Sequence, residues 1–380
     1  MTSAASADSS ESVTVELASE SDDAALRRLA CDMPLRGRIT ISLEREPSFF
    51  DAASIEGDRH HVVILRAPGS GRIVAMGSRS VRKVYVNGSV ARLGYLGQLR
   101  VAPQFCRSRR LLAKGYGFAR TLRRHDELPY DLTSIMVDNT AATRLLTAGL
   151  SGLPSYVPFE RFVTLVVAVR GRIAKRRARD VRIERGSVET AGEIAAYLQR
   201  NGRRFQFAPH WTAADLRSPV RTRGLALSNF YLALRGTHVA GCLAIWDQRA
   251  FKQTVVHAYA TPLRWLRPFV NMTAPLLGVP RLPPPHQSMD FAFASHIALD
   301  DDDPRILTEL LSAARRDLRV ADMECVVLGF TAGNPLLAEM RRRLPHRAYE
   351  SQLYLVNWGS DRDVLSALDK RVSHVEVALL

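Results

Sequence analysis

The segment Tyr95–Leu112 constrains the fold of this chain more than any other part of the sequence. Its first part predicts a strand, which ends before Pro103 because proline has no N–H to donate to a sheet. A loop containing Arg107, Arg109 and Arg110 then leads into a helix, whose first N–H groups have no intrahelical partner. These N–H groups, the helix dipole and the arginines favour a bound pyrophosphate, and an ordinary turn before a solvated basic helix is the alternative.

The first half of the chain predicts one α/β layer. Apolar runs predict strands at 13–17, 61–65, 73–76, 81–86, 91–101, 132–137 and 162–169. Periodicity and capping residues predict helices at 22–29, 109–122 and 140–148. A meander with a turn at Asn87-Gly88, followed by a strand–helix–strand crossover, indicates a mixed and mostly antiparallel sheet flanked by helices.

The second half partly repeats this order. It predicts strands at 181–183, 230–234, 239–246, 254–259, 289–293, 324–328 and 352–356, and helices at 190–198, 305–317 and 335–344. The stretch Thr261–Pro285 holds seven of the nineteen prolines and predicts a long irregular surface loop, with a lid or partner-binding segment as the alternative. We therefore expect a diverged tandem pair of domains: a disordered tail at 1–12, a first domain at 13–169, a basic linker at 170–180, a second domain at 181–358 and a C-terminal extension at 359–380.

The net charge of +15 predicts an anionic ligand or partner. Much of the charge is local, because Arg107–Arg124 carries seven basic residues and Arg170–Arg179 carries six, with no acid in either stretch. Cofactor phosphates, nucleic acid and an acidic surface would all fit. Nucleic acid stays open without being favoured, since basic charge alone specifies little.

Several classes of protein are excluded by pattern. The cysteines at 31, 106, 242 and 325 lie far apart without metal-ligand spacing, so we expect no metal site. The longest candidate membrane segment, Phe162–Val169, is far shorter than the roughly 20 residues of a spanning helix. The first residues lack the pattern of a signal peptide. We expect a cytoplasmic protein without a membrane partner, and a homodimer is left open.

The strand end Leu99-Arg100-Val101-Ala102-Pro103 and its loop resemble motif A of the GNAT (general N-acetyltransferase) superfamily. In that motif a strand ending in Val-x-Pro precedes an Arg/Gln-x-x-Gly-x-Gly/Ala loop and a helix. Arg107 matches the first loop position, but Arg110 and Leu112 stand where the family has glycine and a second small residue, and one residue is inserted after Pro103. Since glycine lets the backbone approach phosphates closely, these departures imply weaker or differently placed contacts.

A second match lies downstream. The stretch from Asn139 to Leu150 resembles the family's Asn-x-x-Ala-x-x-Leu-Tyr…Gly-Phe helix, with Gly149 one residue early. Leu146 stands where the family often has a tyrosine that acts as general acid. Tyr156 is the candidate catalytic acid nearby, and a packed aromatic residue is its alternative.

The resemblance implies an acyl-CoA-dependent N-acyltransferase that binds acetyl-CoA as cosubstrate in a V-shaped split between central strands. It implies direct attack by a neutral amine of a small molecule or protein. The strand end, loop, helix start and second cap would form the cofactor site: Leu99, Arg100, Val101, Arg107, Arg109, Arg110, Leu111, Leu112 and Asn139. Glu44 and Glu46, where the family places its acceptor loop, are the candidate catalytic bases, with a solvated surface as their alternative.

The corresponding loop of the second half carries Asp300–Asp303, and four carboxylates repel a pyrophosphate. We therefore predict a degenerate second GNAT-like domain without CoA, which supplies part of the acceptor site or a dimer surface. Two other functions stay open. One is a catalytically silent sensor that binds CoA or nucleic acid, and the other is aminoacyl transfer from tRNA, as in Fem-type ligases.

Overall fold

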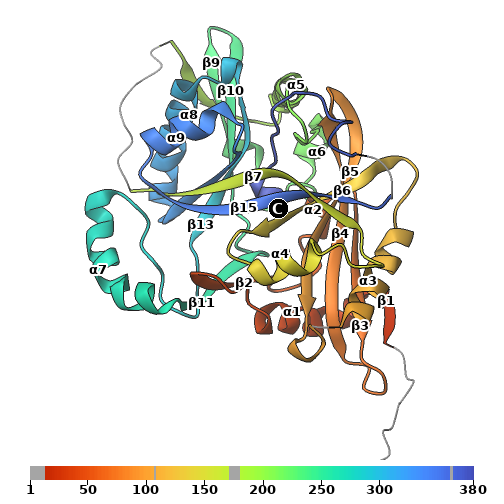
Figure 1. The fold of residues 1–380 in the computed structure, drawn as a ribbon. Coiled ribbons are helices and arrows are strands. Elements are labelled where there is room, and N and C mark those ends of the chain that lie inside the picture. Colours follow the sequence, from red (N-terminus) through yellow and green to blue (C-terminus); the bar gives the residue numbers. More distant parts are fainter. Residues whose placement is uncertain (1–12, 107, 171–179, 360–362) are drawn as a thin grey trace, which may run out of the picture.

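A computed structural model describes residues 13–106, 108–170, 180–359 and 363–380. The expected N-terminal tail, Arg107 and most of the basic linker lie outside the described residues. Most of the strands form one continuous 12-stranded sheet (Figure 1). In spatial order they are β1 Thr14–Leu17, β3 Arg59–Arg66, β4 Ile73–Val86, β5 Ser89–Val101, β6 Glu127–Met136, β15 His346–Asn357, β7 Ser155–Ala168, β14 Cys325–Thr331, β13 Phe291–Leu299, β10 His238–Trp246, β9 Phe230–Arg235 and β8 Arg182–Arg185.

Helices cover both faces of this sheet, and the predicted α/β class is confirmed. They are α1 Asp23–Asp32, α2 Ala53–Glu56, α3 Arg109–Thr121, α4 Thr140–Leu146, α5 Ala191–Gly202, α6 Ala213–Arg217, α7 Thr261–Leu277, α8 Pro304–Val320 and α9 Pro335–Arg343. A smaller sheet contains β2 Ile39–Glu44, β11 Gln253–Tyr259 and β12 Gln287–Ser288. The sequence patterns predicted β11 but missed β2, which pairs with β11 across the two halves of the chain.

The two halves share strands. The last long strand, β15, lies between β6 and β7 and is antiparallel to both. Strand β7 in turn pairs with β14, so the final strand of each half joins the sheet of the other. The segment 363–380 also returns to the core, where Val377 and Leu379 are buried.

Alternate residues of β3 and β4 separate the two faces of the first half. Val62, Ile64 and Met76 pack with Leu26 of α1 in one apolar cluster. Their neighbours Val63, Leu65 and Ala75 pack with Leu111 of α3 in another. Because side chains alternate along a strand, α1 and α3 cover opposite faces of the sheet.

The stretch Thr261–Pro285 contains a helix, α7, so the expectation of an irregular loop is wrong. Pro262 lies in the first turn, where its missing N–H costs nothing, although Pro268 and Pro275 lie further inside. Asn271 anchors the helix, since its Nδ2 donates to the Leu282 carbonyl at 2.9 Å and its Oδ1 accepts from Leu282 N at 2.7 Å. Residues of α7 also pack against Val256 and Ile41, which lie outside this stretch. The proline pattern does not report these tertiary contacts, so the helix was not predicted. Across the described ranges, no helix has both the length and the apolar character needed to cross a bilayer.

Candidate active site

The parallel strands β5 and β6 pair at one end and then diverge. Their register joins Arg92 to Glu127, Gly94 to Asp131 and Tyr95 to Leu132, and it ends there. From Leu96 onward, β5 therefore has no strand on its β6 side in the part of the chain that the structure describes. Its backbone groups are left available for an extended ligand, in the way that a sheet edge binds a peptide.

A buried ion pair fixes the closed end of this split. Arg79 donates from Nε and Nη2 to the two carboxylate oxygens of Asp131, each at 2.8 Å. Trp358 of the C-terminal region adds a hydrogen bond from Nε1 to Asp131 at 3.0 Å. Gly94 lies against this pair so closely that a Cβ there would be 2.0 Å from Asp131 Oδ1. Only glycine therefore fits at this position of β5.

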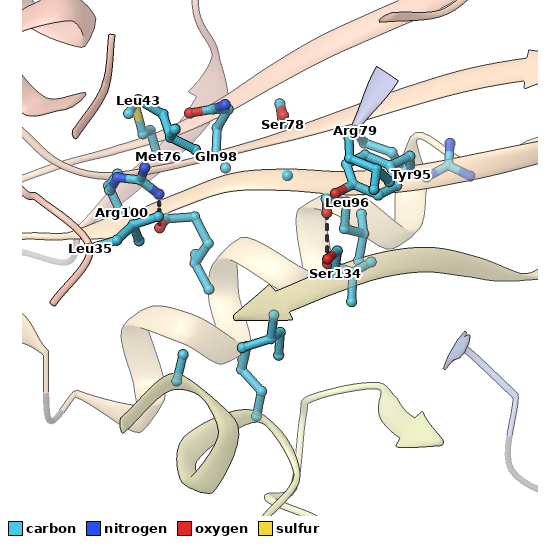
Figure 2. Close-up of a pocket in the computed structure, with 18 of the residues that line it drawn as sticks. Leu35, Leu43, Met76, Ser78, Arg79, Tyr95, Leu96, Gln98, Arg100 and Ser134 are labelled. Carbon is cyan, nitrogen blue, oxygen red and sulfur yellow. Dashed lines mark hydrogen bonds between the residues drawn. The ribbon is translucent and has the colours of Figure 1, made fainter. Parts of the chain in front are cut away.

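A cavity of about 360 Å³ occupies the split and reaches both faces of the sheet (Figure 2). On the α3 side its wall includes Leu99, Leu111 and Leu112. On the other side the wall comes from β2, α2 and the strand residues that face them, among them Leu43, Arg45, Glu56, Met76 and Arg100. The cavity could therefore hold two ligands that meet within it, one entering from each face of the sheet.

Strand β5 is irregular where it lines this cavity. The register with β4 shifts between Met76 and Ser78, and Gln98 adopts a left-handed φ of 54°. A bulge of this kind turns backbone groups out of the regular ladder. Thr133 of β6 spans the split with one hydrogen bond, from Oγ1 to the Leu96 carbonyl at 2.8 Å.

Part of the predicted cofactor site lines the cavity. Leu99, Arg100, Leu111, Leu112 and Asn139 do so. Among the other predicted residues, Val101 packs against the cluster on the α3 side, Arg109 and Arg110 are exposed on the first turn of α3, and Arg107 lies outside the described residues.

The start of α3 is capped and exposed. Ser108 is the N-cap, and its Oγ accepts from Leu111 N at 3.3 Å. Asn139 caps α4 in the same way, with Oδ1 accepting from Ala142 N at 3.2 Å. Each cap satisfies one N–H group and leaves others in its first turn without an intrahelical partner.

Tyr156 lines the cavity together with Tyr116 of α3, which the sequence analysis did not single out. Their hydroxyl oxygens lie 2.5 Å apart. Burial raises the pKa of Tyr156 well above its ordinary value, and burial also raises the pKa of Tyr116 to about 12. Tyr116 lies one helical turn after Leu112, so the helical spacing could have identified it.

Glu44 and Glu46 are not in the cavity wall. Glu44 accepts a hydrogen bond from Ser42 Oγ at 2.5 Å, and Glu46 is paired with Arg27. The two candidate bases therefore lie beside the cavity without lining it.

Ligand atoms of Glu44, Cys31 and His257 lie within 4.8 Å of one another. Three such groups do not complete the four-coordinate set of a structural zinc site.

The carboxylate that does line the cavity is Glu56, at the end of α2. Its Oε1 lies 2.5 Å from Arg45 Nη2 and 3.8 Å from Lys252 Nζ, and its Oε2 lies 3.4 Å from His60 Nδ1. Burial works to raise the pKa of Glu56, but the Arg45, Lys252 and His60 charges outweigh it and lower that pKa to about 2. The residues of this network come from distant segments, so no local pattern marks Glu56.

Three of the four acids at 300–303 interact with other residues of the second half, and Asp302 does so through Arg204. Asp303 is the N-cap of α8 and accepts from Arg305 N at 2.8 Å. Asp300 Oδ1 accepts from the Tyr197 hydroxyl at 3.1 Å. The acidic loop thus caps a helix in the place where the first half has a basic loop.

Comparison with solved structures connects this architecture to known proteins. No protein-family model matches the sequence, and no curated protein matches it. The N-myristoyltransferase of Saccharomyces cerevisiae with bound myristoyl-CoA is similar in structure, with a TM-score of 0.57 and 13% identity over 96% of this chain and 84% of that one. A GCN5-related N-acetyltransferase from Sphaerobacter thermophilus has a TM-score of 0.51 and 13% identity over 92% and 98% of the two chains.

A third match is the GCN5-related glucosamine N-acetyltransferase region of a fungal multi-domain GH3 β-N-acetylglucosaminidase. Its TM-score is 0.58 at 13% identity, and the match covers 92% of this chain but only 38% of that protein. This chain has the GNAT fold. The expectation of a GNAT-like α/β fold is thereby confirmed, and the split between β5 and β6 lies within it.

Proposed function

We propose that this protein is an acyl-CoA-dependent N-acyltransferase. The observation that carries the proposal is the edge of β5 from Leu96 to Val101, which pairs with no strand of the described residues on its β6 side and borders a cavity reaching both faces of the sheet. An extended ligand arm can pair with this edge from the α3 side, while an amine can approach from the side of α2 and β2. Both the open edge and the two-sided access are needed for direct transfer between two bound molecules.

The residues at hand suit acyl-CoA on the α3 side. Leu99, Leu111 and Leu112 offer an apolar wall, and the exposed Arg109 and Arg110 stand at the helix start, where phosphates are favoured. Acyl-CoA would supply the acyl group activated as a thioester. The acyl chain length is set by how far the cavity can be filled, so acetyl-CoA and longer acyl-CoAs are both to be tested.

The tyrosine pair can serve the leaving group. Both hydroxyls stay neutral at ordinary pH, because burial raises the pKa of each phenol. Tyr156 can therefore donate a proton to a departing thiolate. Either hydroxyl of the pair can be the donor, and in this step Tyr116 would donate to Tyr156 and orient it. N–H groups of β5 can donate to the oxygen of the acyl carbonyl and stabilise the charge that develops there.

Calorimetry with the full chain tests the proposal directly. We expect saturable binding of acetyl-CoA or a longer acyl-CoA, followed by release of free thiol when an amine acceptor is added. Binding without transfer to a broad set of amines would favour the silent sensor instead. Absence of heat at millimolar acyl-CoA would refute the proposal.

A further inference from the structure

A buried guanidinium lies in the cavity without a full set of partners. Arg100 is 7% exposed, and its Nη1 donates to the Leu99 carbonyl at 2.9 Å (Figure 2). Its Nε and Nη2 have no hydrogen-bond partner among the described residues and are shielded from water. An unpaired buried donor is costly, and more so on a charged group, so a side chain in this state calls for a ligand.

The two free nitrogens of Arg100, Nε and Nη2, form the edge of the guanidinium with which other arginines of this protein bind carboxylates. Arg79 donates from the same two nitrogens, Nε and Nη2, to both oxygens of Asp131. Arg249 does the same with Asp247, at 3.0 and 2.7 Å. Because the fork of Nε and Nη2 matches the spacing of two carboxylate oxygens, Arg100 presents a complete site for one carboxylate.

The surroundings of Arg100 favour a group with a single negative charge. Figure 2 shows it beside Leu35, Leu43 and Met76. Glu56, the carboxylate in the same wall, is already paired with Arg45. No carboxylate of the described residues is therefore paired with Nε and Nη2 of Arg100. A dianionic phosphate would be poorly compensated by one guanidinium in such apolar surroundings, whereas a carboxylate matches it.

Arg100 also lies on the face of the sheet opposite to α3, where acyl-CoA is proposed to bind. It pairs in register with Met76, which packs in the α1 cluster, whereas α3 covers the opposite face. We propose that Arg100 binds a carboxylate carried by the acceptor, so that the substrate is an amino acid or another amine with a carboxylate close to its amino group. This inference rests on the proposed function. Because Nε and Nη2 of Arg100 are shielded from water, neighbouring side chains must shift to admit the ligand.

Matched pairs of acceptors test the inference. Phenylalanine against phenethylamine and leucine against isoamylamine differ only in the carboxylate. With acyl-CoA saturating, we expect kcat/KM to favour the amino acid, and Arg100→Met to reduce that preference by about 10- to 100-fold, as expected for a charge-assisted contact. Arg100→Lys should retain part of the preference, because it keeps the charge without the fork.

Arg123→Met is the matched control. Arg123 also has a buried unpaired Nε and an Nη bonded to a carbonyl, that of Leu128, but it does not line the cavity. Its substitution should leave the preference intact. An equal loss in Arg123→Met, or no preference in the wild type while both amines are acylated, overturns the inference and leaves the proposed function standing.

A binding assay separates the two hypotheses in the other direction. Without acyl-CoA, N-acetylphenylalanine should raise the melting temperature of the wild type but not of Arg100→Met, and N-acetylphenethylamine should raise neither. This result together with no acyl-CoA binding would refute the proposed function and retain the carboxylate site. Equal shifts of the melting temperature with both compounds, or reduced acyl-CoA affinity in Arg100→Met, would show that Arg100 does not serve to bind the carboxylate of the acceptor and would overturn the inference.

An independent observation concerns the outer face of α7, which projects from the edge of the molecule (Figure 1). One stripe of this helix exposes six large apolar side chains: Trp265, Leu266, Phe269, Met272, Leu276 and Leu277. Trp265 is 77% and Leu276 88% exposed. Contiguous exposed surface of this kind marks an interaction site.

The charges around this stripe indicate its partner. Residues 261–289 contain no Asp or Glu, and Arg264 and Arg281 are exposed. A second copy of the chain related by a two-fold axis would set these arginines against their own copies. We infer that the α7 face docks on a lipid bilayer that contains anionic lipids, which accepts Trp and Phe at its interface and attracts arginine. This inference differs from the expectation of no membrane partner, which the vesicle experiment below also tests.

Co-sedimentation of the full chain with vesicles tests this inference. We expect binding to phosphatidylcholine vesicles containing phosphatidylglycerol, weaker binding to phosphatidylcholine alone, and release by salt. Trp265→Ser with Phe269→Ser should lower the vesicle-bound fraction about tenfold or more, given the transfer energy of two large side chains. Val188→Ser with Val320→Ser removes exposed apolar groups elsewhere and should change nothing. Failure of the wild type to bind, or a dimer in light scattering that the α7 variant dissociates, would overturn the inference.

Discussion

The hydroxyl oxygens of Tyr116 and Tyr156 lie 2.5 Å apart at the wall of the cavity. Tyr116 comes from α3 and Tyr156 from the start of β7, so the pair joins a helix and a strand that both contribute to the cavity wall. Burial raises the pKa of both phenols, that of Tyr116 to about 12. Both are therefore protonated throughout the range in which an enzyme is assayed.

Substitution of Tyr156 by Phe should lower kcat about 10- to 100-fold or more, the usual contribution of a positioned acid, with a smaller effect on KM. The pH–rate profile of the wild type should show no fall from these groups below about pH 11, because each phenol keeps its proton below its raised pKa. Tyr130→Phe is the control, since Tyr130 is buried in another cluster and does not line the cavity. An unchanged kcat in Tyr156→Phe would remove it from the proposed mechanism.

Gly94→Ala should destabilise the fold. The added Cβ would meet Asp131 Oδ1 at 2.0 Å and the Arg79 guanidinium at 2.7 Å, so the buried pair must break or β5 must move. Separating a buried ion pair costs about 3–5 kcal/mol. Urea denaturation of the full chain measures the loss.

Gly117→Ala is the matched control. Gly117 lies in α3, and a Cβ there meets nothing within 4 Å. Because alanine favours the helix over glycine by about 0.5–1 kcal/mol, this variant should be slightly more stable than the wild type. Equal stability of the two alanine variants would contradict the packing described at the closed end of the split.

Glu56 should make stability depend on pH in acid. Its folded-state pKa is lowered to about 2 against an ordinary value of 4.5, so its contribution is present above pH 4.5 and is lost as pH falls toward 2. That shift corresponds to about 3 kcal/mol. The difference in free energy of unfolding between the wild type and Glu56→Gln should shrink across this window. A difference that stays constant from pH 6 to pH 3 would show that the ion pairs of Glu56 contribute little.

Arg110 should contact the phosphates of acyl-CoA. It is exposed on the first turn of α3, where solvent weakens each charged contact, so Arg110→Ala should raise Kd only about 3- to 10-fold. The effect should diminish in high salt. Arg120→Ala, at the other end of the same helix, is the control in calorimetry. Equal affinities of the two variants would show that the basic face of α3 is only solvated.

Local signals made one wall of the site predictable. The proline after Val101 and the apolar spacing beyond Arg109 predicted a strand end and a helix at 109–122, and α3 spans Arg109–Thr121. The opposite wall depends on contacts between distant segments: β2 pairs with β11, and Glu56 meets Lys252. Periodicity reports which face of an element is apolar but not which element covers it. The burial of Arg100 thus became visible only in the assembled fold.

The two halves should differ in cofactor binding, with one CoA site per chain. In the first half α3 begins with exposed arginines, whereas in the second half Asp303 caps α8 and Asp302 is paired with Arg204. Replacing Asp300–Asp303 by Asn removes the negative charge but retains a side-chain oxygen that can cap a helix. We therefore expect calorimetry of this variant to show the same single site with nearly unchanged affinity. A second CoA site in the wild type, or loss of binding in the variant with four Asn residues, would show that the second half takes part in CoA binding and would contradict the prediction.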